Sequence, residues 1–411
     1  MRQLTVTHPS GAVGTFTARL TRHSRSLVWN ECSFETENPY TDSANGPTIV
    51  TDNFALTTKT ISGAGLTPAT WTMAYASPSP SFGGDLGGVQ DPPTDASDQK
   101  MATITNPDQT RTRYTFGIRY FVNEGEMLRT EMLSSTGVLL RDENNTYARN
   151  PVSPPYAVIA GNSGVAFADD FVDTYRVPRT QTVVSQNGDT FTSTVNSFDA
   201  YARPVSMTQS SSLGSSRSDT MAYYDDTTRW VLGQVRSVTN TNTGAVMMAM
   251  DFDAATALPI RVYQFGLLQM NLAYNADGTV ASMRNALGQT TTLGSWKRGV
   301  PQLITNPDQT TRSAVVDNNG WVTSVTDERG SSTQYGYDRL GRSTSLTYPT
   351  ADTVAWTGAT MNYTQLTAAE LGVPSGAWRV RMNQGNHQVS MYLDARYNPI
   401  LSEDRDLRTY P

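Results

Sequence analysis

The chain has 411 residues, of which 37% are apolar and 17% are charged, with a formal net charge of -6. These values describe a soluble protein large enough for several domains or one repeat array, and they exclude a disordered tail. Because its 31 Lys and Arg residues are scattered among 37 Asp and Glu residues, no basic stripe is available for a phosphate backbone. Nucleic acid is therefore not an expected partner.

The longest apolar runs are far shorter than a membrane span. Residues 246–250 form one of them, whereas a membrane-crossing helix needs roughly 20 apolar residues. Residues 1–9 show neither an apolar core nor a small-residue cleavage site, so no signal peptide is visible, and Met1 can equally be an internal start. Cys32 is the single cysteine; it excludes an intrachain disulfide and leaves the redox compartment open.

The composition favours strands and turns over helices. Thr is frequent, and the chain holds 31 Gly, 21 Pro and 19 Tyr. Thr and Tyr are typical of strands, whereas Gly and Pro are typical of turns. We therefore expect an all-β protein.

The first hundred or so residues divide into two parts. Residues 1–75 alternate apolar and polar side chains, as in Leu4–Thr7, and predict either a small β-rich segment or the first strands of a larger sheet. Residues 76–100 are rich in Pro and Gly and predict a loop at a domain boundary. The glycine cluster at 83–88 occurs once, so a loop is favoured over a calcium-binding β-roll turn.

Residues 101–271 carry degraded copies of a repeat that becomes regular further on. The segment Ile104–Thr110 recurs word for word at Ile304–Thr310. Phe198–Pro204 has the spacing of a later segment that begins at Tyr337. Such partial copies indicate one repeat array rather than unrelated domains.

The regular part of the array covers residues 272–349. Its turns are marked by glycines that recur every 21 residues, Gly278, Gly299, Gly320 and Gly341. The position five residues after each glycine is always apolar: Met283, Ile304, Val325 and Leu346. Each unit thus reads as a hairpin, with Asp-Gly and Asn-Gly turns among its signals. Because a two-stranded hairpin cannot bury its apolar face alone, the units must stack into one sheet.

Residues 350–411 continue the strands. The pattern returns at Leu393–Ile400, with Tyr397 in the glycine position. Thr364–Leu371 has Thr367 and Glu370 at the spacing of a capping box, which predicts a short helix of at most two turns.

One unit of the array, at residues 335–342, resembles a known repeat. Tyr335-Gly336-Tyr337-Asp338-Arg339-Leu340-Gly341-Arg342 resembles the YD repeat of the bacterial Rhs proteins, which also occurs in insecticidal toxin-complex shells and in animal teneurins. The stretches that begin at Tyr114 and Tyr223 resemble connecting segments of Rhs chains. The resemblance covers about three quarters of the chain.

The resemblance implies a β-shell, in which hairpins stack into a curved or spiralling sheet around a C-terminal toxin polypeptide. It also implies a bacterial protein that is secreted or held at the cell surface, with no cofactor. The family's Asp-Pro and Gly-rich motif near the end of the shell is missing, because Asp91-Pro92 is the only Asp-Pro pair. We therefore carry over neither a self-cleaving site nor a toxin, and expect a segment of a larger shell or an orphan without cargo.

The resemblance gives structural roles to the repeat residues. Tyr337 is expected to pack on the neighbouring strand, and Asp338 to cap the turn by accepting backbone N–H bonds. Gly341 would supply a positive φ, as would Gly278, Gly299 and Gly320. Arg342 would pair with an acid of an adjacent unit or cover apolar surface with its stem. A sugar-binding role for the Tyr-Asp pairs is the less favoured reading.

Catalytic and metal-binding patterns are weak. The chain has three histidines, His8, His23 and His387, but it lacks the Gly-x-Ser-x-Gly motif that carries the nucleophilic serine of many hydrolases. Adjacent acids such as Asp225 and Asp226 point to opposite faces of a strand and are poor candidates for a glycosidase pair. We therefore expect no enzyme, no metal and no cofactor.

Three functions remain. The first is a non-enzymatic shell segment that encloses or presents a toxin or effector polypeptide, with that polypeptide or the remainder of the shell as its partner. The alternative is a surface adhesin or glycan-binding module, for which exposed aromatic rows are required and only Trp296 and Trp321 offer a hint. The third is an enzyme on a β-solenoid. A chain of this length is not expected to close by itself, so its terminal strands should be exposed and prone to association.

Overall fold

The computed structural model describes residues 1–29, 50–80, 82–83, 98–120, 122–149, 151–158, 176–350 and 356–408. Among these residues the chain forms strands and no α-helix. In chain order the strands are β1 (Arg2–Thr7), β2 (Val13–Ser24), β3 (Val28–Trp29), β4 (Val50–Ser62), β5 (Ala69–Ala76), β6 (Phe82–Gly83), β7 (Gln99–Thr105), β8 (Arg111–Gly117), β9 (Met127–Leu133), β10 (Leu139–Tyr147), β11 (Arg179–Gln186), β12 (Asp189–Phe198), β13 (Pro204–Ser211), β14 (Ser216–Asp226), β15 (Val231–Asn240), β16 (Val246–Phe252), β17 (Pro259–Gln264), β18 (Leu267–Tyr274), β19 (Val280–Asn285), β20 (Thr290–Gly294), β21 (Leu303–Thr305), β22 (Thr311–Val316), β23 (Val322–Thr326), β24 (Ser332–Tyr337), β25 (Ser343–Thr347), β26 (Ala359–Gln365), β27 (Trp378–Gln384), β28 (His387–Leu393) and β29 (Pro399–Asp406).

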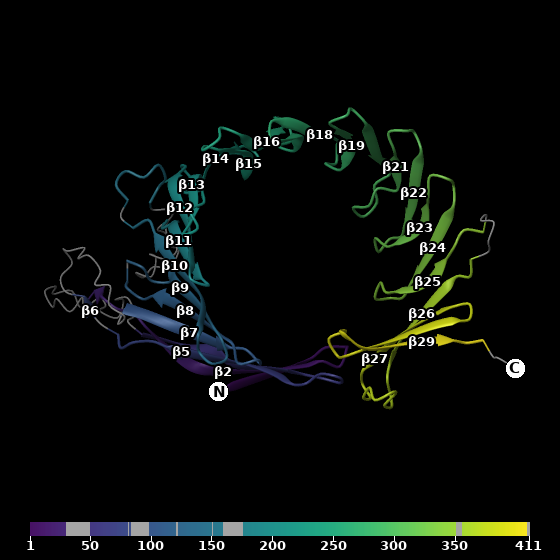
Figure 1. Cartoon of the computed structure of the whole chain (residues 1–411), viewed down its shortest axis with the longest axis horizontal. Coiled ribbons are helices and arrows are strands. Elements are labelled where there is room, and N and C mark those ends of the chain that lie inside the picture. The colour runs from purple at the N-terminus through teal and green to yellow at the C-terminus, as the bar shows by residue number, and fades with distance from the viewer. Residues whose placement is uncertain are drawn as a thin grey trace, which may run out of the picture.

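A single 27-stranded sheet contains all of these strands except β3 and β6, which form a short parallel ladder of their own. Within the large sheet each strand pairs antiparallel with the next one along the chain, from β1 and β2 to β28 and β29. The sheet bends round until its two ends meet, so the chain encircles an open lumen (Figure 1). The predicted all-β sheet of stacked, curved hairpins is confirmed.

The cross-strand register gathers many apolar side chains on one face of the sheet. Leu346 lies opposite Tyr335 on one side and Ala359 on the other, whereas its neighbour Ser345 lies opposite Thr360. Residues that are directly opposite share a face of the sheet. Following this register along the array, the apolar face carries Val184, Phe191, Val195, Met207, Met221, Val238, Met248, Met250, Val262, Met270, Leu272, Met283, Leu293, Ile304, Ala314, Val325, Tyr335, Leu346, Ala359, Met361, Met382 and Val389.

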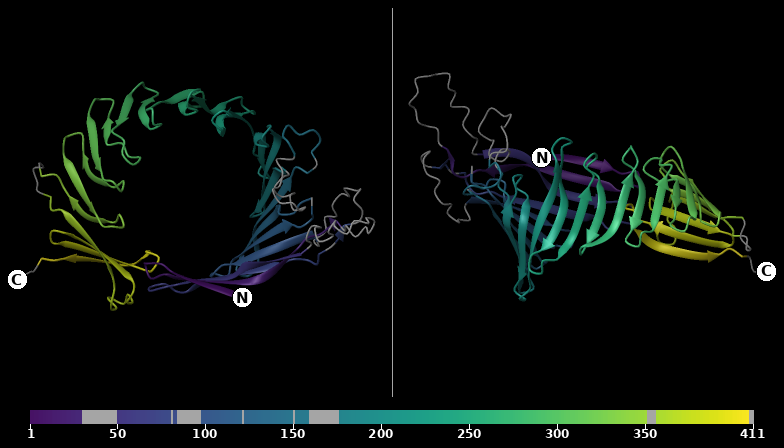
Figure 2. Two further views of the ribbon diagram at one scale, coloured as in Figure 1. Left: turned by 180° about the vertical axis from the view of Figure 1, so that it is seen from behind. Right: turned by 90° about the horizontal axis from the view of Figure 1, so that it is seen from above.

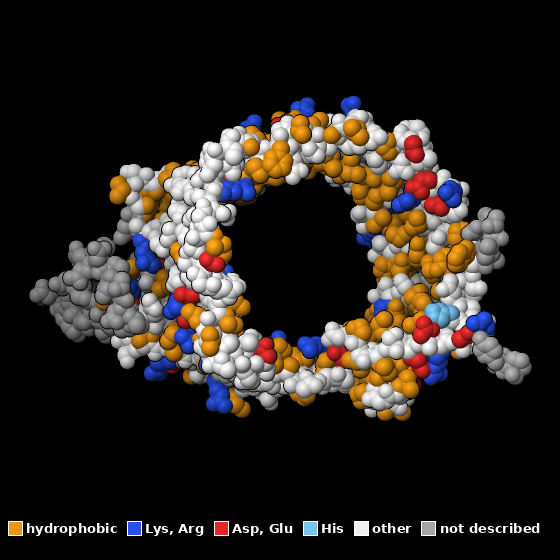
Figure 3. Space-filling model, in the orientation of Figure 1, with side chains coloured by type: hydrophobic (Ala, Val, Ile, Leu, Met, Phe, Trp, Pro, Cys, Tyr) orange, Lys and Arg blue, Asp and Glu red, His pale blue; other side chains and the backbone are white. Residues whose placement is uncertain are grey.

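The apolar face lines the lumen. Hydrophobic side chains gather on the inner wall over β21–β25, while charged side chains of both signs stand on the outer side (Figure 3). The chain exposes 25249 Å² of accessible surface, whereas a compact monomer of 44.9 kDa exposes about 16,000 Å². The excess follows from a wall one sheet thick, with no second layer to cover its inner face.

The strip winds as one turn of a spiral. Successive turns of a meander lie at opposite ends of the strands, so the strip has two rims. We call rim A the one with the turns after β1, β4, β7 and every second strand thereafter, and rim B the one with the turns after β26 and β28. Seen from above, the first strands lie higher than the last ones (Figure 2).

A seam joins rim A of the first strands to rim B of the last ones. The Ser10 hydroxyl donates a hydrogen bond of 2.5 Å to the carbonyl of Ala395, and the Ala395 N–H donates to the carbonyl of Ala64 at 3.0 Å. The Trp378 indole N–H donates to the carbonyl of Ser10 at 2.9 Å. These bonds connect residues more than 300 positions apart and close the ring without a strand ladder.

The seam is also closely packed. Ala395 is fully buried and Ser10 is 1% exposed. A Cβ on Gly63 would stand 2.6 Å from the Cβ of Ala395, so the backbones approach as closely as glycine allows. Beside this contact lies a cluster of buried side chains with its partly buried neighbours, Leu366, Val373, Ala377, Tyr392, Ala64 and Leu401. The seam joins turns of the two rims, whereas β1 and β29 do not pair with each other, so the sheet itself stays open.

Residues 364–371 do not form the predicted helix. Thr364 and Gln365 belong to β26, where they pair with β27. The chain then turns, with Leu371 and Gly372 at positive φ, and buries Leu366 in the seam cluster. A helix of two turns is marginal by itself, and pairing with a sheet edge and burial of Leu366 outweigh its capping signal.

The sheet runs through the predicted boundary at 76–100. β5 pairs directly with β7, with Ala76 opposite Met101. Residues 1–75 are therefore the first strands of the same sheet, one of the two arrangements that their sequence left open. At its outer edge β1 is exposed along its whole length, and β29 pairs only with β28.

Insertion of a bulky charge at the seam should open the ring. Ala395→Arg places a guanidinium where no space exists, so we expect the amides of the 8–12 and 63–66 turns to exchange hydrogen at least about tenfold faster, the signature of local opening. Hydrogen exchange followed by mass spectrometry measures this. Arg396→Ala, at the exposed neighbouring position, is the control; equal rates in the two variants would contradict the seam.

Candidate functional site

The tyrosine of the YD motif fastens one hairpin to the previous one. The Tyr337 hydroxyl donates to the carbonyl of Val322 at 2.8 Å, and its ring packs beside Trp321 with 5.6 Å between centroids. Tyr274 and Tyr223 donate in the same way to the carbonyls of Pro259 and Pro204. The tyrosine therefore acts as a staple between successive strands at rim B.

Asp338 organises the turn that follows. Its carboxylate accepts hydrogen bonds from the N–H groups of Leu340 and Arg342 at 2.9 and 3.0 Å and from the Arg342 Nε at 2.6 Å. Desolvation opposes ionisation, but the hydrogen bonds of Arg342 outweigh it and lower the pKa of Asp338. Asp199, Asp317, Asp327 and Asp394 accept the same pair of backbone bonds in their turns.

Gly341 is required for two reasons. Its φ is 80°, in the left-handed region that costs other residues energy. A Cβ there would also meet the Trp321 indole at 3.1 Å. The other predicted glycines have φ of 82° at Gly278, 80° at Gly299 and 90° at Gly320.

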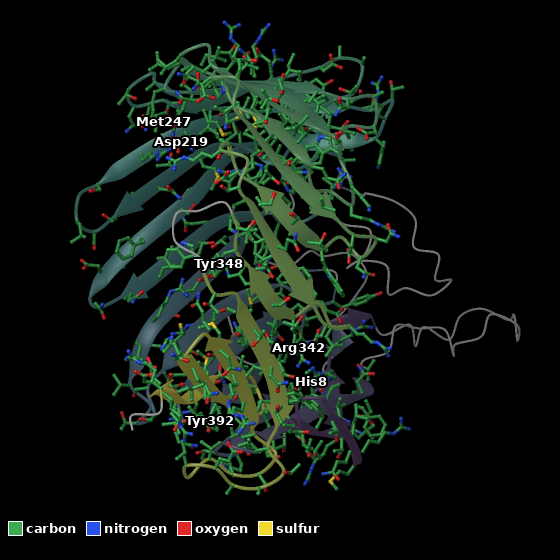
Figure 4. All side chains as sticks on the ribbon, turned by 90° about the vertical axis from the view of Figure 1, so that its right-hand side faces the viewer. His8, Asp219, Met247, Arg342, Tyr348 and Tyr392 are labelled. Atoms are coloured by element: carbon green, nitrogen blue, oxygen red, sulfur yellow. The ribbon has the colours of Figure 1, made fainter. Side chains whose placement is uncertain are left out.

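The ion pair of Arg342 differs from the expected pair with an acid of an adjacent unit. It pairs with Asp338 of its own turn, not with an acid of another unit. The guanidinium lies over the ring of Tyr363 at 4.4 Å and near Trp378 at 5.7 Å, both in the next hairpin, within reach of a cation–π attraction. Because Trp378 bonds to Ser10, this arginine connects the YD turn to the seam; Arg342 and the seam residue His8 are both labelled in Figure 4.

An upstream copy of the motif carries an arginine that pairs with two acids. Arg203 donates to Asp199 of its own turn at 2.6 Å and, with two bonds of 2.7 Å, to Asp225 on β14. The same guanidinium stacks on Tyr223 at 4.3 Å. Such bidentate pairs hold two hairpins in one geometry.

The second feature of the site is the lumen wall. Methionine is frequent on the apolar face, and several of its larger side chains remain open to the lumen, including Phe191 at 45% and Met270 at 36% exposed. A groove of about 580 Å³ on this wall includes Val184, Phe191 and Leu213 among its lining residues. Methionine adapts its shape to many partners, so the wall suits apolar polypeptide segments without demanding one sequence.

The histidines serve structural contacts. His8 Nδ1 lies 2.8 Å from the Ser10 hydroxyl, but Ser10 is buried in the seam and already bonded to Ala395. His387 pairs with Asp404 at 2.7 Å, and the His23 ring lies beside Tyr75. Cys32, Asp91 and the glycine cluster at 84–88 lie outside the described residues.

Several acids and cations form ion pairs. Asp225 and Asp226 bind different arginines, Arg203 and Arg229. A pocket of about 220 Å³ includes Lys100, whose pKa burial lowers, and the ion pair of Arg25 with Glu124. Across the described ranges no group of three metal-ligating side chains comes together, and no helix there is long and apolar enough to cross a membrane.

Sequence reasoning missed the residues of the seam. Ser10, Ala64, Trp378 and Ala395 carry no motif, and they are brought together only by the curvature of the whole strip. A weak signal was available at Tyr397, which replaces the turn glycine, adopts φ of 64° and packs against His8 and Trp378.

The fold and its turns define a wall-forming β-strip built from repeated hairpins, and the comparisons agree. The RHS Repeat family matches residues 316–353, which contain the Tyr337–Arg342 turn. The crystal structure of TcdB2-TccC3 without its hypervariable C-terminal region is similar with a TM-score of 0.62 and 7% identity, over 96% of this chain and 30% of that one. For TcdB2-TccC3-TEV the values are 0.59, 9%, 96% and 31%.

At these identities the structural likeness concerns the fold. This chain spans about a third of the length of either structure, and no curated protein matches its sequence. The chain thus carries an RHS repeat at residues 316–353 within a fold that it shares with these structures over nearly its whole length.

The ion pair of Arg203 predicts an acid-dependent stability. Hydrogen bonds from Arg203 lower the pKa of Asp225 to about 2, whereas an unfolded Asp titrates near about 3.9. Since the folded pKa is the lower one, the stabilisation is complete above the unfolded pKa and is lost as the pH falls from about 4 to about 2.

Asp225→Asn should remove this dependence. We expect the free energy of unfolding of the native chain to fall by about 1 kcal/mol more than that of the variant over this acid range, measured by urea unfolding at each pH. Asp251→Asn, which alters a more exposed pair with Arg261, is the control. Identical acid dependence in the native chain and Asp225→Asn would contradict the assignment.

Proposed function

We propose that this chain is a wall segment of a hollow β-shell that encloses or presents another polypeptide, a toxin or effector. It acts by containment and not by catalysis. The wall separates the enclosed polypeptide from proteases outside, and the turn staples and ion pairs at its rims give the wall its strength.

The observation that carries the proposal is the direction of the apolar face. A sheet one layer thick has to leave one face uncovered, and here the apolar face is turned to the lumen (Figure 3). Concave curvature lessens the exposure of this face to water but does not cover it, and burial of apolar surface is the main gain in folding. A polypeptide in the lumen would cover the apolar side chains that the curvature leaves exposed.

The similarity to TcdB2-TccC3 supports a role in a toxin assembly, because those structures share this fold across nearly the whole chain. We extend this to a protein that works outside the cell that makes it. The partner would be the enclosed polypeptide or the remainder of the shell.

The alternative, a glycan-binding module, is not favoured. It requires free aromatic rings at the repeat spacing. The Trp296 indole N–H is committed to the carbonyl of Val280 at 3.0 Å, and Trp321 is packed between Tyr337 and Gly341.

The test compares the two faces of one strand. Met270 and Leu272 face the lumen, whereas Asn271 and Ala273 on the same strand face outward. The ligand is a fluorescent polypeptide kept unfolded by reduction and carboxymethylation of its cysteines, and binding is followed by anisotropy. Met270→Lys with Leu272→Lys should weaken binding by about tenfold, because two apolar contacts are replaced by charges.

The outward pair Asn271→Lys with Ala273→Lys is the matched control and should bind like the native chain. Protection of the ligand from protease should follow the same order. Equal weakening by both pairs would show that added charge alone is responsible and would overturn containment. An absence of binding by the native chain would overturn it as well.

A further inference from the structure

A pocket of about 220 Å³ lies at rim B, where β2 and β8 end and β4 and β7 begin. Its polar wall consists of His23 and Ser24 at the end of β2 and of Thr51 and Asn53 at the start of β4. His23 and Thr51 lie directly opposite each other in the ladder between these two strands. Hydroxyl, amide and imidazole groups can all donate hydrogen bonds, so this wall can supply donors to a ligand in the pocket.

Hydrogen bonds and burial hold the polar wall in place. The Ser24 N–H donates to the Ser77 hydroxyl at 3.0 Å, and the Ser26 N–H donates to the carbonyl of Ile118 at 2.9 Å. These bonds join the end of β2 to the segments that follow β5 and β8. Ser24 and Ser26 are both buried. The pocket is therefore formed before a ligand arrives, and binding requires little ordering of the protein.

The charged side chains of the pocket are Arg25, Lys100 and Glu124. Arg25 Nε donates to a carboxylate oxygen of Glu124 at 2.6 Å, and both side chains are largely buried. Lys100 lies on β7, and within the described part of the chain its ammonium group forms no hydrogen bond and no ion pair. Since Glu124 is the only acid among the three and already binds Arg25, these side chains leave one positive charge in excess.

Desolvation makes this positive charge costly. It lowers the pKa of Lys100 despite the opposing effect of Glu124, and the charge of Arg25 lowers the pKa further. Desolvation and the charge of Lys100 also lower the pKa of His23, whereas Asp52 raises it. A negative charge in the pocket would act against both shifts, because it stabilises the protonated forms of Lys100 and His23.

We propose that this pocket binds one small oxyanion, such as sulfate, phosphate or a carboxylate group, with Lys100 as its principal cation. The hydroxyl of Thr51 and the amide of Asn53 supply uncharged donors to its oxygens. The volume of about 220 Å³ is below the roughly 300 to 1,000 Å³ of pockets that take drug-sized ligands, so the ligand is small. Binding of this ion does not depend on whether a polypeptide occupies the lumen.

Isothermal titration calorimetry of the full chain with sodium sulfate, at neutral pH and low ionic strength, tests the proposal. We expect saturable binding of one ion per chain. Lys100→Gln should weaken binding at least about tenfold, because a hydrogen bond to a charged group contributes more than the roughly 1.4 kcal/mol that this factor represents. Lys59→Gln is the matched control and should bind like the native chain, since Lys59 lies over the ring of Trp71 and outside the pocket.

Two further variants make the outcome specific to this pocket. Glu124→Gln removes the negative charge beside the ion and should tighten sulfate binding severalfold, a gain that a misfolded variant would not show. Binding by the native chain should also strengthen as the pH falls from about 8 to about 6, because His23 gains a proton more readily when the anion is bound. His23→Gln should reduce this pH dependence.

A second titration separates a free ion from a carboxylate of a polypeptide. The ligand is an N-acetylated peptide with a free C-terminal carboxylate, and the same peptide with a C-terminal amide is its control. Binding of sulfate or of the carboxylate peptide that Lys100→Gln weakens and Lys59→Gln preserves supports the proposal, and the tighter ligand identifies the source. Absence of saturable binding of both ligands, equal weakening by the two lysine variants, or weaker binding by Glu124→Gln would overturn it.

Discussion

An amphipathic sheet with no second layer can curve with its apolar face on the concave or on the convex side, and the rest of this structure depends on which of the two occurs. Register alternation gathers methionines and aliphatic side chains on one face, which also carries the ion pair of Arg217 with Asp219. The strip curves so that its apolar face is concave, and the concavity creates the lumen. Curvature also brings the ends of the strip together, so a chain with few fully buried side chains still holds one global shape.

The turns stabilise the strip locally, and the seam stabilises its closed shape. Along the strip, each turn is held by local contacts: an aspartate that accepts two backbone N–H bonds, a glycine at positive φ, and a tyrosine bonded to the preceding strand. Across the seam, three hydrogen bonds and a small buried cluster join the two rims. Arg342 belongs to both systems, because it completes a YD turn and packs against Trp378 at the seam.

Local features could be predicted from the sequence, whereas global ones could not. Gly341 and Asp338 reveal their turn because the signals lie within a few residues of one another. Ser10 and Ala395 are 385 positions apart, and their contact depends on the summed curvature of many strands. The direction of the apolar face could not be predicted for the same reason. The alternation of side chains shows which residues share a face, but it does not show which face is concave. The helix at 364–371 was wrong because a local capping signal competed with a sheet edge that only the assembled array provides.

Small-angle X-ray scattering of the chain at low concentration tests the central claim most directly. A compact protein of this length has a radius of gyration of about 22 Å, and a wall around an open lumen has a clearly larger one, with a pair-distance distribution shifted to long distances. The account predicts the larger value and the hollow profile. A radius close to the compact value would contradict it, because the strip would then have collapsed onto its own apolar face.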